Sequence, residues 1–127
     1  MARTKINVTA LSADTAANAI AGGVFQAGDV ANGNYLSGSE IGKAGTLVLY
    51  VKNGDAAPQT VTVLEGVGGH LGLGWRAGLG DLVITAAADT GEQICHITDT
   101  ARFKQADGTI HIDVSDADTD VAAFILS

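Results

Sequence analysis

Short runs of alternating apolar and polar residues constrain the fold of this chain more than any other feature. The clearest run, Thr46–Lys52, is rich in β-branched and aromatic residues and places its two leucines and Val51 on one side. Residues 5–11 and 59–64 alternate in the same way. Because successive side chains of a strand point to opposite faces, each run predicts a strand with one buried face.

Turn residues separate these runs. Asn53–Asp55, Ala106–Gly108 and Asp116–Asp120 carry the Asn, Asp and Gly residues that favour turns. We expect the runs on either side of the first turn to form a hairpin. Further strands are expected near residues 24–25, 35–36, 81–85, 93–98, 101–105, 109–114 and 121–126. Roughly eight short strands at a spacing of about 8–12 residues predict an all-β fold, an antiparallel β-sandwich or barrel.

The chain of 127 residues has the length of one domain. We predict a single β domain over residues 1–127, with an N-terminal strand and irregular arm at 1–45 and the core at 46–127. Aromatic residues make up only 5% of the chain, so we expect a thin, aliphatic core. The side chains expected to form this core are Leu47, Leu49, Val51, Val61, Val63, Phe103, Ile110, Ile112 and Phe124.

The charge of the chain is distributed unevenly. Residues 1–80 hold five basic and five acidic residues, whereas residues 81–127 hold two basic and nine acidic residues and account for the net charge of −7. Nucleic acids and anionic membrane surfaces attract clustered Lys and Arg, so the sequence predicts neither of them as a partner. The sequence also lacks an apolar run of about 18 residues, the length that a membrane-spanning helix needs.

Cysteine usage and the N-terminal residues bear on the compartment in which the chain folds. Cys95 is the single cysteine, which excludes an intrachain disulfide and favours folding in the cytoplasm. The basic residues that follow Met1 are not succeeded by a continuous apolar stretch, so no signal peptide is predicted.

Residues 66–80 contain seven glycines. Gly72–Gly78 is close to a phosphate-binding glycine pattern, but no helix pattern follows it, and such sites need a helix N-terminus. We predict instead a long surface loop that docks on a partner, because its Trp and Arg are residue types enriched at interface hot spots. With the N-terminal arm, this loop gives the predicted interface: Leu71, Leu73, Trp75, Arg76, Leu79, Val24, Phe25 and Tyr35.

The histidines and the cysteine do not suggest a metal or nucleophilic site. His70, His96 and His111 lack the spacing of zinc ligands. Cys95 adjoins His96 in a predicted strand, so the two side chains would point to opposite faces and could not act as a dyad. We therefore expect no catalytic residues, no enzyme activity and no cofactor.

An acidic turn near the C-terminal end of the sequence raises the question of calcium. Asp116, Asp118 and Asp120 resemble the first three calcium ligands of an EF-hand loop. Val121 and Ser127 stand where that loop needs Gly and Glu, and no flanking helices are expected. We expect no metal ligands here and interpret the segment as an acidic turn between strands, although the sequence leaves a bound calcium ion open.

Several segments of the chain, mostly within residues 46–126, share a pattern with one protein family. They are Met1–Thr4 with Val8–Ser12, Leu47–Asn53 with Gln59–Val63, Gly80–Val83, and Ala101–Val114 with Val121–Phe124. Through these segments the chain resembles the small head decoration, or cement, proteins of tailed bacteriophages. The segments resemble a central and a C-terminal hairpin of that family, and they are signatures of a fold rather than of an active site.

The resemblance implies a β-sandwich or barrel that binds the outside of a capsid, often as a homotrimer, and reinforces contacts between major capsid protein subunits. It further implies a virion location on the capsid exterior, after synthesis in the host cytoplasm. An alternative hypothesis is a phage tail- or fibre-associated β-domain that binds host carbohydrate or another virion protein. Exposed aromatic side chains would favour the alternative, and the candidates are Tyr35, Tyr50 and Trp75.

Overall fold

The structure of the protein, a computed structural model, describes residues 2–11, 25–38, 46–66, 81–89, 91–97, 100 and 103–126. Over these residues the chain forms ten strands. They are β1 (Thr4–Lys5), β2 (Val8–Leu11), β3 (Gln26–Ala27), β4 (Asn34–Leu36), β5 (Thr46–Asn53), β6 (Gln59–Val63), β7 (Leu82–Ala86), β8 (Glu92–Ile97), β9 (Ile110–Val114) and β10 (Thr119–Leu126).

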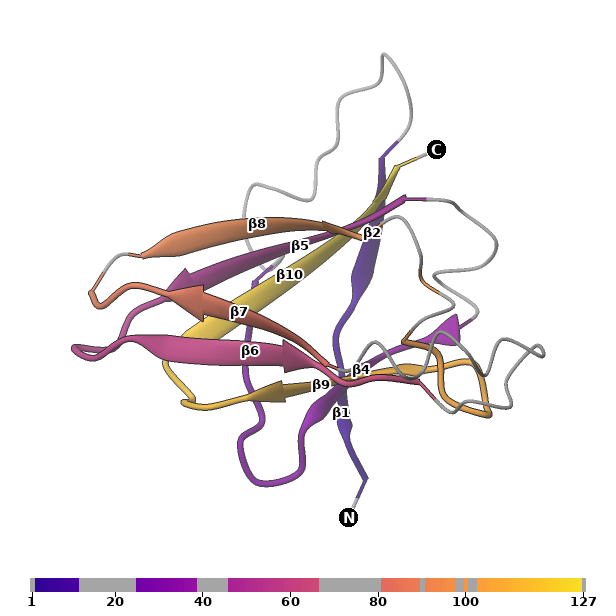
Figure 1. Ribbon diagram of the computed structural model, residues 1–127, viewed down its shortest axis with the longest axis horizontal. Coiled ribbons are helices and arrows are strands. Elements are labelled where there is room, and N and C mark those ends of the chain that lie inside the picture. Colours follow the sequence, from indigo (N-terminus) through magenta and orange to yellow (C-terminus); the bar gives the residue numbers. More distant parts are fainter. Residues whose placement is uncertain are drawn as a thin grey trace.

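The strands form two sheets that stack face to face (Figure 1). The first sheet has the order β1-β4-β9-β6-β7, and the second has the order β2-β10-β5-β8, with β3 pairing to β10 as well. The pairs β1–β4 and β2–β10 are parallel, and the other pairs are antiparallel. The two sheets do not close into a barrel. The predicted all-β fold is therefore confirmed as a sandwich, but its sheets are mixed rather than purely antiparallel.

Most connections between consecutive described strands cross from one sheet to the other. Only β2–β3 and β6–β7 stay within a sheet, and β6–β7 is the only consecutive pair that is hydrogen-bonded. The hairpin predicted across Asn53–Asp55 is wrong, because β5 and β6 lie in different sheets. The segment that resembles a C-terminal hairpin does turn back at Ala106–Gly108, where Lys104 and Ile110 form an isolated antiparallel bridge, although residues 103–105 form no strand. A turn sequence shows where the chain reverses, but not whether the next strand stays in the same sheet.

The core lies between the inner faces of the two sheets. Strand β5 alternates as predicted, with its two leucines and Val51 fully buried. Eight of the nine predicted core side chains are buried. Phe124 is the exception, since it lies opposite Val48 on the outer face while Ala123 and Ile125 point inward. Residues 121–126 are apolar on both faces, so alternation could not set the register of this strand.

One edge of the sandwich, here called the closed edge, is formed by β1 and β2. The chain passes from the first sheet to the second within two residues, and Ile6 at this crossing is 1% exposed. The backbone N–H of Ile6 donates to the carbonyl of Tyr35 at 2.9 Å. Gln26 accepts a hydrogen bond from the Asn7 N–H at 2.6 Å and donates one to the Lys5 carbonyl at 3.0 Å. Side chains and backbone therefore join the two sheets at this edge.

The opposite edge, here called the open edge, is formed by β7 and β8. No described backbone pairing joins these two strands along their length. They are held together at one end by Asn53, which is 1% exposed. Its Nδ2 donates to the carbonyls of Ala57, Ala86 and Ala87 at 2.9, 3.3 and 3.0 Å. The side chain of β5 thus anchors the start of the β7–β8 connection.

Candidate interaction surfaces

The outer face of the second sheet carries a small aromatic cluster. The rings of Phe25 and Tyr50 meet edge to face, with centroids 5.2 Å apart and planes at 86°. The Lys52 ammonium lies 4.8 Å from the centroid of the Phe25 ring. The Tyr50 hydroxyl donates a hydrogen bond to Glu92 on β8, and this bond raises the pKa of the tyrosine. Phe25, a predicted interface residue, therefore lies over β5 and is only partly exposed.

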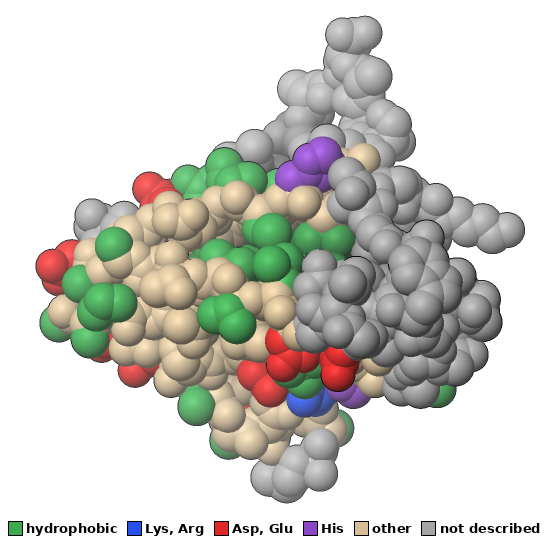
Figure 2. Space-filling view, in the orientation of Figure 1, with side chains coloured by type: hydrophobic (Ala, Val, Ile, Leu, Met, Phe, Trp, Pro, Cys, Tyr) green, Lys and Arg blue, Asp and Glu red, His purple; other side chains and the backbone are tan. Residues whose placement is uncertain are grey.

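Large apolar side chains are exposed on both strands of the open edge. Among the described residues, the large hydrophobic side chains that are exposed are Val30, Val83 and Ile94. Val83 on β7 is 56% exposed, and Ile94 on β8 is 64% exposed. Figure 2 shows hydrophobic side chains at the surface over β8 and between β8 and β7. Val83 and Ile94 lie on the outer faces of different sheets, so each is a separate candidate contact residue.

The outer face of the first sheet has a groove with a volume of about 420 Å³. It is lined by Arg3, Tyr35, Asp107, Thr109 and His111. Burial lowers the pKa of His111, and the nearby Arg3 guanidinium lowers it further. The Thr109 hydroxyl and N–H donate to Asp107 at 2.7 and 3.0 Å and hold the pKa of that carboxyl below its usual value. The groove therefore combines one aromatic ring with charged and hydroxyl groups.

Two turns bring acidic side chains together at one end of the sandwich. Carboxylate oxygens of Asp55, Asp116 and Asp118 lie within 4.8 Å of one another. Asp120, which the sequence grouped with the last two, instead lies opposite Lys52 in the β5–β10 ladder. Asp55 comes from the β5–β6 turn, so sequence spacing alone could not place it in this group. Hydrogen bonds from Gln59 and the N–H of Ala57 lower the pKa of Asp55.

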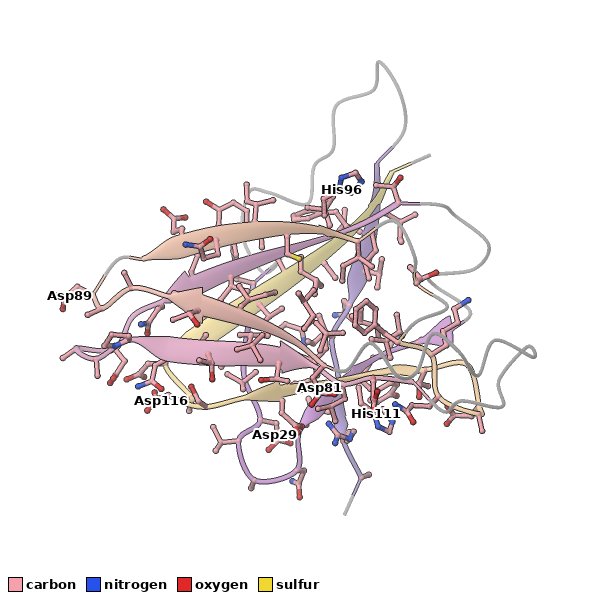
Figure 3. All side chains as sticks on the ribbon, viewed as in Figure 1. Asp29, Asp81, Asp89, His96, His111 and Asp116 are labelled. Carbon is pink, nitrogen blue, oxygen red and sulfur yellow. The ribbon has the colours of Figure 1, made fainter. Side chains whose placement is uncertain are left out.

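A second acidic feature adjoins this end of the sandwich. A cavity of about 310 Å³ is lined by Lys52, Asn53, Gly54, Asp89, Glu92, Asp118 and Asp120. In Figure 3, Asp89 and Asp116 lie at the same end of the molecule. The acidic half of the sequence therefore contributes a locally acidic surface.

The cysteine and the two described histidines lie apart, as the alternation predicts. On β8, Cys95 pairs with the buried Leu49, and His96 pairs with Val48, so their side chains point to opposite faces. Burial raises the pKa of the Cys95 thiol, which disfavours the reactive thiolate. His96 and His111 lie on different sheets and on opposite sides of the sandwich (Figure 3). The arrangement confirms that Cys95 and His96 do not form a dyad.

The predicted interface is described only in part. Phe25 and Tyr35 are described, and they lie on the outer faces of different sheets, so the structure does not bring them together. The other members of the predicted interface lie outside the described residues: Leu71, Leu73, Trp75, Arg76, Leu79 and Val24. His70 also lies outside them. Sequence reasoning missed Val83 and Ile94, whose exposure depends on β7 and β8 being edge strands.

Comparison of the chain with protein-family models, with curated proteins and with solved structures finds no match. Within the part of the chain that the structure describes, no helix has the length and apolarity needed to cross a membrane.

Proposed function

We propose that this protein is a non-enzymatic structural protein that binds the outer surface of a bacteriophage capsid and stabilises contacts between major capsid protein subunits. The proposal starts from the resemblance of residues 46–126 to phage head decoration proteins. The structural observation that carries it is the exposure of Val83 on the edge strand β7. Exposed apolar side chains on edge strands favour docking onto another protein.

The charge distribution supports a protein partner on the capsid exterior. The acidic surface near Asp89, Glu92 and Asp118 would repel packaged nucleic acid. A partner with basic groups would complement it, and electrostatic complementarity favours correct docking.

The resemblance also supports self-association as a homotrimer. The composition of the glycine-rich segment at residues 66–80 supports a role for it in capsid contact, because its apolar side chains and Trp75 need a surface to cover them. Ordering a glycine-rich segment costs about 1–2 kcal/mol of backbone entropy per residue. Burial of its leucines and Trp75 against a capsid surface would offset part of that cost. The loop and the open edge are therefore the two surfaces to test.

Binding to undecorated heads of the source phage tests the proposal. The protein should cosediment with heads, saturate at a copy number comparable to that of the capsid subunit, and raise the temperature at which the heads disassemble. Val83→Lys should weaken this binding, whereas the control Val30→Lys, at a site that is 51% exposed in the β3–β4 turn, should not. Heads that never bind the wild-type protein in a saturable way would refute the proposal.

Two further variants test the loop. Trp75→Ala and deletion of residues 70–77 should each reduce binding to heads while the protein stays folded. If both variants bind with unchanged affinity and keep the mass of the wild-type assembly, the loop is not the capsid interface.

One observation favours the alternative function, a tail- or fibre-associated domain that binds host carbohydrate. Tyr35 lines a groove together with Arg3, Asp107 and Thr109, and a sugar ring could stack on the aromatic face while its hydroxyls bond to the polar groups. Glycan-array binding that is lost in Tyr35→Ala would support this alternative, and the same assay would separate it from capsid binding.

A further inference from the structure

Among the described residues, the backbone of β8 pairs on one side only. β8 is hydrogen-bonded to β5 from Glu92 to Ile97, and no described residue pairs with its other side. In an antiparallel ladder, the N–H and C=O of one residue point to the same side, so alternate residues of β8 present both groups at the free edge. Such a row of donors and acceptors can accept another strand.

The sequence of β8 does not protect this edge. In natural proteins, Lys or Pro residues, bulges or inward-pointing charges usually prevent an edge strand from pairing with another chain. β8 contains neither Lys nor Pro, and its single acidic residue, Glu92, stands at one end. Ile94 in the middle of the strand is 64% exposed. The edge therefore combines free backbone groups with an exposed apolar side chain.

The side chains of β8 complement a second copy of the same strand. In an antiparallel pair with Ile94 on the twofold axis, Glu92 lies opposite His96 of the partner subunit at both ends. Ile94 then lies against the partner's Ile94, which covers the most exposed large apolar side chain among the described residues. These three side chains share the outer face of the sheet, since they pair with Lys52, Tyr50 and Val48 of β5.

The chemistry of the end pairs is also suitable. An imidazole N–H of His96 can donate a hydrogen bond to a carboxylate oxygen of Glu92. Glu92 accepts the Tyr50 hydroxyl through Oε1, which leaves Oε2 for the partner. Cross-strand pairs of this kind are what specify register between antiparallel strands.

The other strand of the open edge offers no such match. β7 is also an edge strand, but a pair centred on Ile84 would place Val83 opposite Thr85 of the partner subunit, with no charged pair. Val83 is exposed to a similar extent as Ile94. β7 is therefore a matched control for β8.

We infer that β8 pairs antiparallel with β8 of a second copy of this chain, so that the second sheet continues across a twofold axis. A contact of this type is isologous, because the same surface is used by both subunits. It is independent of the proposed capsid binding and of any threefold contact, and it is tested in the absence of heads.

Disulfide cross-linking tests the register. Residues opposite each other in an antiparallel pair have Cα atoms about 4.5–5.5 Å apart, a separation that a disulfide can span. Ile94→Cys in a Cys95→Ser background should form a covalent dimer on mild oxidation, and Val83→Cys in the same background should stay monomeric on a non-reducing gel. Equal cross-linking of the two variants, or none in the first, would overturn the inference.

The mass of the assembly tests the same contact without a new cysteine. By sedimentation equilibrium, the wild-type protein should form an assembly with an even number of chains, and Ile94→Lys should halve its mass while Val83→Lys leaves it unchanged. A wild-type protein that is monomeric or trimeric at high concentration contradicts the inference.

Glu92→Lys and His96→Glu should each weaken the dimer about tenfold, because the first removes the acceptor for the His96 N–H and the second places two carboxylates opposite one another at both ends of the pair. An equimolar mixture should restore it, since the new lysine then faces the new glutamate and the native Glu92 faces the native His96. A mixture that associates no better than either variant alone would show that β8 does not pair in this register.

Discussion

The two edges of this sandwich differ in how the first sheet is joined to the second. At the closed edge, the chain itself passes from one sheet to the other, buries Ile6 and bonds both sheets to Gln26. At the open edge, β7 and β8 lie without mutual pairing and expose Val83 and Ile94. Because the described bonds join the sheets at the closed edge, we expect substitutions there to change stability more than substitutions at the open edge.

The largest expected contrast is between buried and exposed side chains at the two edges. Ile6→Ala should lower the free energy of unfolding by about 2–5 kcal/mol, because it leaves a cavity at the closed edge. Val83→Ala at the open edge should change it by less than about 0.5 kcal/mol. Urea denaturation of both variants measures this contrast. Similar losses of unfolding free energy in the two variants would contradict the difference between the edges.

The next largest effect should come from the one anchor at the open edge. Asn53→Ala should cost about 1–3 kcal/mol, because the buried carbonyl of Ala86 and its neighbours lose their donor. Thr85→Ala, at an exposed site on β7, is the matched control and should be close to neutral. Hydrogen exchange should show faster opening of β7 in the first variant only. Unchanged exchange there would mean that Asn53 does not hold this edge.

A smaller effect is expected from the turn that supports the closed edge. Gly33 has a φ of +81°, and a Cβ there would lie 2.3 Å from the Arg3 guanidinium. That guanidinium bonds the Asp113 carboxylate at 2.8 Å and the Asn34 carbonyl at 3.2 Å. Gly33→Ala should cost about 1–2 kcal/mol for the strained backbone alone, plus the displacement of Arg3.

A double-mutant cycle separates these two contributions. Arg3→Ala alone should cost no more than about 1 kcal/mol, since the ion pair is partly exposed. In the Arg3→Ala background, Gly33→Ala should cost the backbone strain and a small shift of the Asp113 carboxylate, which would lie 2.8 Å from the new Cβ. Strict additivity of the two changes would show that the glycine does not serve to admit Arg3.

The smallest effect concerns pH. The folded protein lowers the pKa of His111 below its ordinary value of 6.5, so the unfolded chain takes up a proton first as the pH falls. Stability should therefore decrease below about pH 6.5, and His111→Gln should reduce this decrease between pH 6.5 and 5. The pKa values of Asp29, Asp55 and Asp107 are also lowered in the folded protein. The stability that these carboxylates contribute is lost at lower pH than the His111 effect, below about pH 4. Parallel pH profiles for wild type and variant would contradict the role of His111.

The sequence predicted the strands better than their arrangement. The alternation in residues 46–52 gave the correct buried face, because one side of that run is consistently apolar. Residues 5–11 also alternate, yet they form two strands in two sheets, since Ile6 and Asn7 form the crossing. Alternation records which side is buried, but not which strand lies alongside.

The sequence likewise identified residues of the candidate surfaces, but not which of them lie together. The sequence identified Phe25 and Tyr35 by residue type, but their positions on different sheets follow from pairings between distant residues. Asp55 joins Asp116 and Asp118 because two turns meet at one end of the sandwich. Ile94 occurs in an apparently ordinary strand, and only its place at the edge of the sheet makes it a candidate contact residue.

The parallel pairing of β2 with β10 also affects how the protein folds during synthesis. Val8 lies next to Ala123, so β2 cannot form this pairing until β10 has been synthesised. At about 5–20 residues per second, roughly 6–23 seconds separate the two. Until β10 is synthesised, β5 also lacks its hydrogen-bonded neighbour on that side. The nascent chain is therefore expected to depend on chaperones until β10 emerges, and such distant pairings slow the final folding step.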